Sequence, residues 1–230
     1  SWVQDVGRLM ALWAAAIAIG VVWVMLDRSV PAWDQAEHLS LAMNHWWTLT
    51  HQEGGWWAEG LRPLWMLTPK YPPVFYWVTA GVHHVVGPGP DQALGANALF
   101  GLGLFIATYS LGRHLFSPQI GLLAVGVSLL MPRLIGIGLD YQLDYAVTAL
   151  VMVSFWCLTV WRDAPPGWRR WGWMLAFGLS YGLALMTKQS AVLFLGVPLL
   201  WVTVAAVWQR RWQRLWQLAL GALLTTLLML

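Results

Sequence analysis

The sequence predicts an all-α fold: a polytopic bundle of about seven transmembrane helices, with amphipathic helices along the membrane surface in the first external loop. Hydrophobic residues make up 59% of the chain and charged residues only 10%, against about a quarter in soluble domains. Apolar runs of roughly 20 residues, long enough to cross a bilayer, recur along the chain. The 19 Trp residues also favour a membrane protein, because an apolar ring with one N–H suits the membrane–water interface.

The first predicted span is Leu9–Leu26, which lacks a small-residue cleavage site after it and is therefore expected to remain as a helix. An external loop, residues 27–90, follows it. Its segments Trp33–Thr50 and Glu53–Leu67 are too charged to span and are expected to lie along the interface as amphipathic helices. Five tryptophans would anchor them: Trp46, Trp47, Trp56, Trp57 and Trp65.

Pro73–Val86 is apolar over only about 14 residues, which suits a re-entrant or interfacial segment better than a full span. Six further spans are predicted after it: Gln92–Gly112, Pro118–Gly138, Tyr145–Trp161, Trp171–Thr187, Ala191–Trp208 and Leu215–Leu230. All belong to a single module, residues 1–230. The chain starts at Ser1 and stops inside an apolar run, so we expect it to be part of a longer protein.

The distribution of charge tests this topology. If Pro73–Val86 does not cross, one face of the membrane holds eight basic and two acidic residues, and the other holds five basic and eight acidic residues. Basic residues in short loops mark the cytoplasmic face, so the N-terminus is expected inside and the acidic loops outside. We therefore expect an integral protein of the bacterial inner (plasma) membrane, with its chemistry on the periplasmic or external face.

Several classes of function are unlikely on sequence grounds. The chain contains no Walker loop, no G-x-G-x-x-G motif and no serine nucleophile elbow, which argues against ATP or dinucleotide use. Its net charge is only +3 and its basic residues are dispersed, so nucleic acid is not an expected partner. Cys157 is the single cysteine, so no intramolecular disulfide can form. The histidines show no metal-ligand spacing (His38, His45, His83 and His84).

The strongest candidate for chemistry is Asp34, which follows the first span. A carboxylate close to a membrane boundary is costly to keep there. It can accept a proton from an attacking hydroxyl or amine, or ligate a metal. The competing interpretation is structural, because Asp34 followed by Glu37 three residues later resembles a capping box at a helix start. The two roles are compatible, since a capping carboxylate can still face a pocket.

Four further charged residues are predicted on the same face: Asp140, Asp144, Lys70 and Lys188. Asp140 and Asp144 are four apart and would share a helix face. There they suggest a cation site or a second acid–base position, with loop solvation as the alternative. The lysines suit a phosphate, although each can also snorkel to lipid headgroups. Together these groups fit a lipid-phosphate substrate.

The order of the motifs resembles that of a known family. The chain contains WDQAEH, KYPPVFYW, LGRHLF, LDYQLDYAVTA and MTKQSA, in this order. The order is similar to that of the integral-membrane C-type glycosyltransferases of the protein O-mannosyltransferase and aminoarabinose transferase kind, from about Leu9 to Trp208. That family has an Asp-Glu pair after its first span, a Lys-Pro-Pro or His-Pro-Pro element, a Leu-Gly-Arg-x-Leu-Phe turn, a Leu-Asp pair and a Thr-Lys.

The resemblance implies roles for individual residues. Asp34 matches the acidic residue that is the catalytic base, and Asp144 matches the carboxylate that lines the active site. Lys188 matches the lysine near the donor phosphate. Glu37 and Asp140 are the further carboxylates expected to contact substrate.

Two positions depart from the family pattern. Gln35 stands where the second acidic residue of the pair is usual, with Glu37 as its candidate substitute. Tyr71 stands where the lysine of the Lys-Pro-Pro element is usual, and Lys70 lies one place earlier. We expect both Lys70 and Tyr71 to contact the substrate.

The resemblance implies an inverting glycosyltransferase that uses a polyprenyl-phosphate sugar donor and an external acceptor, which would be a protein, a lipid or a glycan. No cofactor follows from the motifs, and a divalent cation at the carboxylates is left open. A proton-coupled lipid transporter or flippase is the main alternative. A third interpretation is a membrane-embedded assembly subunit with a degenerate site, which Gln35 favours.

Overall fold

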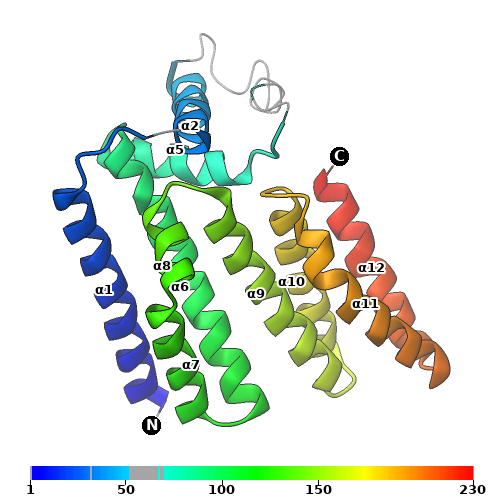
Figure 1. Ribbon diagram of the computed structural model, residues 1–230. Coiled ribbons are helices and arrows are strands. Elements are labelled where there is room, and N and C mark those ends of the chain that lie inside the picture. Colours follow the sequence, from blue (N-terminus) through cyan, green and yellow to red (C-terminus); the bar gives the residue numbers. More distant parts are fainter. Residues whose placement is uncertain (1, 32, 52–66, 68–69, 230) are drawn as a thin grey trace.

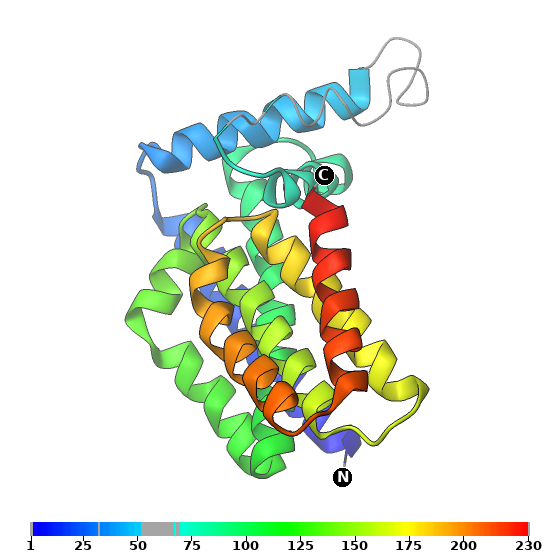
Figure 2. The ribbon, with the colours of Figure 1, turned by 90° about the vertical axis from the view of Figure 1, so that its right-hand side faces the viewer.

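The computed structural model describes residues 2–31, 33–51, 67 and 70–229. Over these residues the chain forms ten α-helices and no strand, which confirms the predicted all-α class. The helices are α1 Trp2–Leu26, α2 Asp34–His51, α5 Val74–Val86, α6 Pro90–Leu115, α7 Pro118–Leu130, α8 Pro132–Leu139, α9 Leu143–Asp163, α10 Trp168–Leu185, α11 Ala191–Trp208 and α12 Trp212–Met229. α2 and α5 lie across one end of a bundle formed by the others (Figures 1 and 2).

Four of the described helices are long and apolar enough to cross a membrane: α1, α6, α9 and α11. The bent pair α7–α8 makes a fifth if it is counted as one span. The other two predicted spans, Trp171–Thr187 and Leu215–Leu230, correspond to α10 and α12, which run beside these helices (Figure 1). Both begin with Arg-containing turns, so the seven expected spans exceed the number that length and composition support. The chain is an integral membrane protein.

The prediction of one continuous span over Pro118–Gly138 is wrong. The chain breaks at Met131, and α7 and α8 are bent by 68° relative to each other. Pro132 explains the break, because the residue before a proline is driven out of the helical region, and Met131 accordingly has a ψ of 110°. Pro132 then starts α8, where its missing N–H is not needed.

The two helices that lie across the bundle come from the predicted external loop. α5, with 13 residues, is the segment expected not to cross the membrane, and it ends at Gly87, whose φ of 90° suits glycine. α2 coincides with the first predicted interfacial helix, Trp33–Thr50. The second, Glu53–Leu67, lies outside the described residues apart from Leu67, together with Trp56, Trp57 and Trp65.

α9 holds the two parts of the core together. It packs between α6 and α10 and contributes Tyr145 to one buried cluster and Trp161 to the other. Beside it, α6 and α7 approach closely, since a Cβ on Gly112 would lie 2.7 Å from the Cα of Gly121. The start of α9, which carries Asp144, is therefore placed by packing on both sides.

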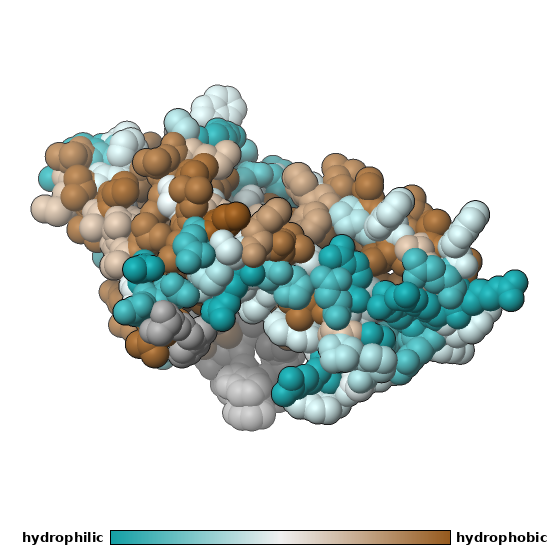
Figure 3. All heavy atoms as spheres, turned by 90° about the horizontal axis from the view of Figure 1, so that it is seen from below, coloured by the Kyte–Doolittle hydropathy of each residue, from teal (hydrophilic) through white to brown (hydrophobic). Residues whose placement is uncertain are grey.

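The bundle separates the charges into two ends, as the predicted topology requires. The connections α1–α2, α8–α9 and α10–α11 meet α2 and α5 at one end, here called the site end (Figure 1). The N-terminus and the connections α6–α7, α9–α10 and α11–α12 lie at the other, here called the arginine end. Seen from the arginine end, hydrophilic residues form a band that widens toward the side of α10–α12 (Figure 3). The arginines of these segments are Arg8, Arg113, Arg162, Arg169, Arg170, Arg210, Arg211 and Arg214.

Candidate active site

The first candidate carboxylate lies at the start of a helix that crosses the site end. α2 begins at Asp34, and its first turn presents two exposed carboxylates, Asp34 and Glu37. Trp33, directly before the helix, has a φ of 49°, a left-handed conformation that is rare for a bulky side chain. Such strain persists only where the surroundings or the function require it.

The described residues do not form the capping box considered for Asp34. The N–H of Glu37 donates to the backbone carbonyl of Trp33 at 3.2 Å, and Asp34 already lies inside the helix. Gln35 and Glu37 serve different sides of α2, because residues two apart do not share a helix face. Gln35 lines a cavity, whereas Glu37 contacts Lys70. Glu37 therefore lies on a different side of α2 from Gln35, and its role as a substitute for the acidic residue stays a prediction.

Lys70 reaches this turn from the segment before α5. Its Nζ lies 3.3 Å from Oε2 of Glu37 and 5.1 Å from the centre of the Tyr71 ring. The hydrogen bond that Lys70 donates to Glu37, together with the charge of that carboxylate, raises the pKa of Lys70. The N–H of Val74 donates to the carbonyl of Met186 at 3.1 Å, which ties this segment to the α10–α11 turn.

The α10–α11 turn supplies the second lysine. Nζ of Lys188 lies 2.8 Å from Oδ1 of Asp144, in the first turn of α9. The two side chains are 29% and 47% exposed, and ion pairs of this kind contribute only about 0–1 kcal/mol to stability. The main effect of the pair is therefore to position the ammonium group of Lys188, and its contribution to the stability of the fold is small.

Asp140 is separate from this pair, and the prediction that Asp140 and Asp144 share a helix face is wrong. Asp140 follows α8 in an extended conformation, with a ψ of 142°, and α9 begins only at Leu143. The side-chain amide of Asn97 in α6 donates to the carbonyl of Asp140 at 3.0 Å and holds the loop there. Asp140 lines a cavity of about 270 Å³ beneath α2, together with Gln35.

His38 lies among these groups. It is one helical turn after Asp34, is only 4% exposed, and its Nδ1 lies 2.8 Å from the hydroxyl of Tyr76 in α5. Burial lowers the pKa of His38, although the neighbouring carboxylates oppose this shift, so the imidazole is neutral near pH 7. The charged groups that act on it are Asp34, Glu37, Lys70 and Lys188. Two carboxylates and two ammonium groups from three separate segments thus act electrostatically on one buried histidine.

An aromatic layer between α2 and α5 supports His38. The ring of Tyr76 stacks on His45 with centroids 5.4 Å apart, and Tyr71 meets the ring of His38 at 5.3 Å. Burial raises the pKa of Tyr76, which keeps its hydroxyl protonated. The sequence did not predict a role for Tyr76. For His38 a signal was present, because a four-residue interval from Asp34 places both on one helix face.

The described residues contain no group of three His, Cys, Asp or Glu side chains that could hold a metal ion. The divalent cation left open by the motifs therefore has no ligand set in this part of the chain.

A family model described as dolichyl-phosphate-mannose-protein mannosyltransferase matches residues 6–230. The chain belongs to this family. The match covers nearly the whole sequence and confirms the resemblance that the motifs indicated. Among curated proteins, none matches the sequence.

Two crystal structures of ArnT from Cupriavidus metallidurans are similar to this family member, one in the apo state and one bound to undecaprenyl phosphate. The TM-score is 0.68 for both, at 21% and 22% sequence identity. The similarity covers 98% of this chain but only 41% and 39% of the ArnT chains. The family member therefore shares the helical membrane fold of ArnT and spans about two fifths of its length.

Proposed function

We propose that this chain is the membrane module of an inverting glycosyltransferase. It would move a sugar from a polyprenyl-phosphate-linked donor to an acceptor protein, lipid or glycan at the site end of the bundle. One observation carries the proposal: at one end of the bundle, two lysines from different segments each lie beside a carboxylate, Lys70 at 3.3 Å from Glu37 in α2 and Lys188 at 2.8 Å from Asp144. Lysine is suited to bind a phosphate, and an exposed carboxylate is suited to accept a proton. Membership of the family and the fold shared with a protein that binds undecaprenyl phosphate support the same class of donor.

In the proposed reaction, Asp34 accepts the proton of the acceptor hydroxyl or amine as that group attacks the anomeric carbon. The bond from this carbon to the phosphate oxygen breaks as the new bond forms, and polyprenyl phosphate leaves with the electron pair. Attack opposite to the leaving group inverts the anomeric centre. Lys188 and Lys70 stabilise the charge that develops on the phosphate, since donors fixed in advance act most strongly there.

The partners of the lysines would set their positions. Asp144 holds the ammonium group of Lys188 at 2.8 Å, and Glu37 holds that of Lys70 at 3.3 Å. We assign Tyr71, beside Lys70, to the donor side and Asp140, in the cavity beneath α2, to acceptor contacts. The many arginines at the opposite end support a cytoplasmic N-terminus and a periplasmic or external site in the bacterial inner membrane.

The test uses the full-length protein in membranes with a radiolabelled polyprenyl-phosphate sugar, and compares wild type with Asp34→Asn. We expect sugar transfer to fall by about 10²–10⁴-fold, the contribution of a positioned general base. Binding of the donor, measured separately, is expected to remain. Asp5→Asn is the matched control: this carboxylate lies at the opposite end of the bundle, and its amide replacement can still accept the hydrogen bond from the hydroxyl of Tyr109.

Equal transfer by wild type and Asp34→Asn would exclude Asp34 as the base and direct attention to Glu37. If no donor is turned over but labelled lipid crosses the bilayer, the result would favour the lipid transporter over the glycosyltransferase as the function of this protein. A transporter would be expected to place its charges near the bilayer midplane, whereas those described here gather at the ends of the bundle.

A further inference from the structure

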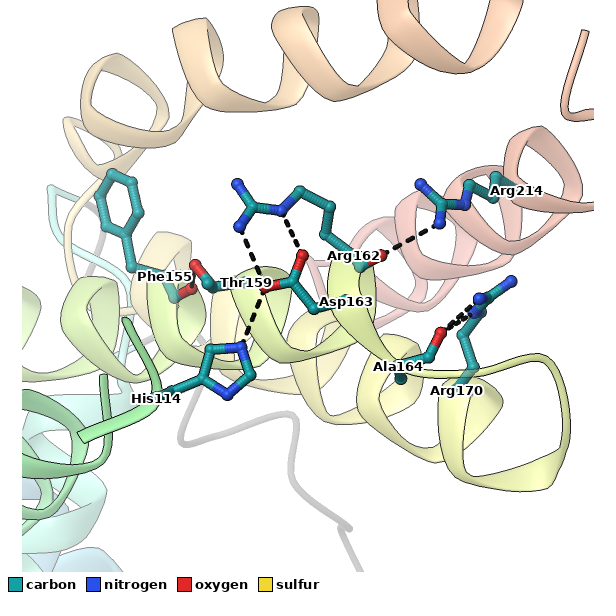
Figure 4. A network of polar contacts seen from close by, with 8 residues as sticks. All are labelled: His114, Phe155, Thr159, Arg162, Asp163, Ala164, Arg170 and Arg214. Atoms are coloured by element: carbon teal, nitrogen blue, oxygen red, sulfur yellow. Dashed lines mark hydrogen bonds and ion pairs between the residues drawn. The ribbon is translucent and has the colours of Figure 1, made fainter. Parts of the chain in front are cut away.

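The arginine end carries a second group of charges that the proposed reaction does not use. Two connections meet there, α9–α10 and α11–α12, and both are rich in arginine. We define the arginine cluster as Arg162, Arg169, Arg170, Arg210, Arg211 and Arg214. Figure 4 shows Arg162, Arg170 and Arg214, which come from three helices: Arg214 and Arg170 each reach a backbone carbonyl near the end of α9, and Arg162 turns back to Asp163.

The cluster has far more positive than negative charge. Asp163 is the carboxylate that pairs with it in the described part of the chain: Nε of Arg162 lies 2.7 Å from Oδ1, and His114 approaches Oδ2 at 3.0 Å (Figure 4). Arg214 donates to the carbonyl of Arg162 at 3.1 Å, and Arg162, Arg170 and Arg211 are its cationic neighbours. Like charges this close repel one another, so an anion at the junction would be bound favourably.

The backbone at Arg210 gives an independent reason to expect a function. Arg210 has a φ of 49°, the left-handed region that glycine adopts freely and that costs other residues about 1–2 kcal/mol. It ends α11 in the usual glycine position, because its own N–H donates to Val207 and that of Arg211 to Ala206. Arg210 is exposed, and glycine would adopt this backbone conformation without that cost.

The side chains around the cluster identify the environment of the anion. Four exposed tryptophans flank the same two connections: Trp168, Trp208, Trp212 and Trp216, at 79%, 87%, 66% and 73% exposure. Exposed tryptophan next to arginine is typical of the headgroup level of a membrane, where the ring stays apolar and the N–H finds water or an ester. These exposed tryptophans would contribute nothing to the binding of a free anion, whereas they would pack against a lipid.

We propose that the arginine cluster binds the phosphate of an anionic glycerophospholipid in the leaflet at the arginine end. The exposed guanidinium groups of Arg210 and Arg211 would meet the phosphate, and the tryptophans would pack against the glycerol and upper acyl region. Arg170 already donates to the carbonyl of Ala164 and would not contact the phosphate directly.

The test measures binding of dioleoyl phosphatidylglycerol and dioleoyl phosphatidylcholine to the full-length protein in detergent micelles, by native mass spectrometry. The variant is Arg210→Gly with Arg211→Gln. We expect its affinity for phosphatidylglycerol to fall about 25-fold, since each basic residue near an anionic headgroup contributes about fivefold, or 1 kcal/mol. Affinity for phosphatidylcholine should stay the same. Arg210→Gly relieves the backbone, so a raised or unchanged thermal midpoint excludes loss of fold as the cause.

Arg8→Gln is the matched control, because Arg8 lies at the same end but outside the cluster, 3.8 Å from Asp5. It should bind phosphatidylglycerol as the wild type does. The proposal is overturned if the double variant keeps wild-type affinity, if both lipids bind wild type equally, or if Arg8→Gln loses as much. Displacement of the lipid by millimolar inorganic phosphate would assign the site to free anions instead.

Discussion

The two ends of the bundle are both charged, but their charges are arranged differently. At the site end, Lys188 and Lys70 each have one carboxylate partner, and both pairs are partly exposed. At the arginine end, a single carboxylate, Asp163, pairs with a cluster of guanidinium groups within the described residues. At the site end each lysine is paired with a carboxylate before any ligand arrives, whereas at the arginine end the guanidinium groups outnumber the carboxylates that pair with them among the described residues.

This difference has a consequence for mutagenesis. Partly exposed pairs contribute little to folding, so substitutions at the site end should change activity far more than stability. The buried guanidinium group of Arg170, which donates to the carbonyl that follows α9, contributes to the fold, so its substitution should change stability and leave transfer intact. The predictions that follow, from the largest effect to the smallest, are designed to break this distinction.

Lys188→Met should give the largest effect. We expect sugar transfer to fall about a hundredfold, because loss of one fixed donor to a developing negative charge has this magnitude. The thermal midpoint should shift only slightly, since the pair with Asp144 is partly exposed. Lys188→Arg, which keeps the charge, should recover part of the transfer. A large loss of thermal stability with proportionate loss of transfer would show instead that the pair holds the fold.

Arg170→Met, at the arginine end, should show the opposite pattern: a loss of stability without a loss of sugar transfer. Arg170 is 7% exposed, and its Nε donates at 2.8 Å to the carbonyl of Ala164, which follows the end of α9. Removing the guanidinium leaves that carbonyl without its donor, which should lower the free energy of unfolding by about 1–3 kcal/mol. The remaining folded protein should transfer sugar normally. Arg169→Met, one position earlier and exposed, should change stability by less than about 0.5 kcal/mol; equal losses in both variants would contradict the prediction.

The smallest effect concerns pH at the site end. Because burial lowers the pKa of His38 in the folded protein, the unfolded chain binds the proton more readily. The contribution of neutral His38 to the free energy of unfolding should be fully present above the ordinary histidine pKa near 6.5. It should decrease as the pH drops below that value, by at most about 1.4 kcal/mol per pH unit for one proton. The test is to measure the thermal midpoints of wild type and His38→Gln between pH 5 and 8. The difference in midpoint between the two proteins should become smaller at acidic pH, because only the wild type carries the titrating histidine. A constant difference would exclude His38 as the titrating group.

Parts of the candidate site followed from local sequence, and other parts did not. Asp34, Asp144 and Lys188 were predicted to meet on one face because alternation of spans and short loops leaves few arrangements. The prediction that Asp140 and Asp144 share a helix face was wrong, because the spacing of two residues does not show whether one helix connects them. Glu37 as a replacement for the acidic residue at Gln35 stays a prediction, although the two side chains lie on different sides of α2.

The sequence by itself determined the membrane class, the helical elements and the division of charge between two ends. These properties depend on composition and on the length of apolar runs, which act locally. Only the tertiary structure decided that α5 and α2 lie against each other and that His38 is buried beside Tyr76. The physical reason is that burial and ion pairing are set by which segments pack together, and contacts such as Lys188 with Asp144 join residues 44 positions apart.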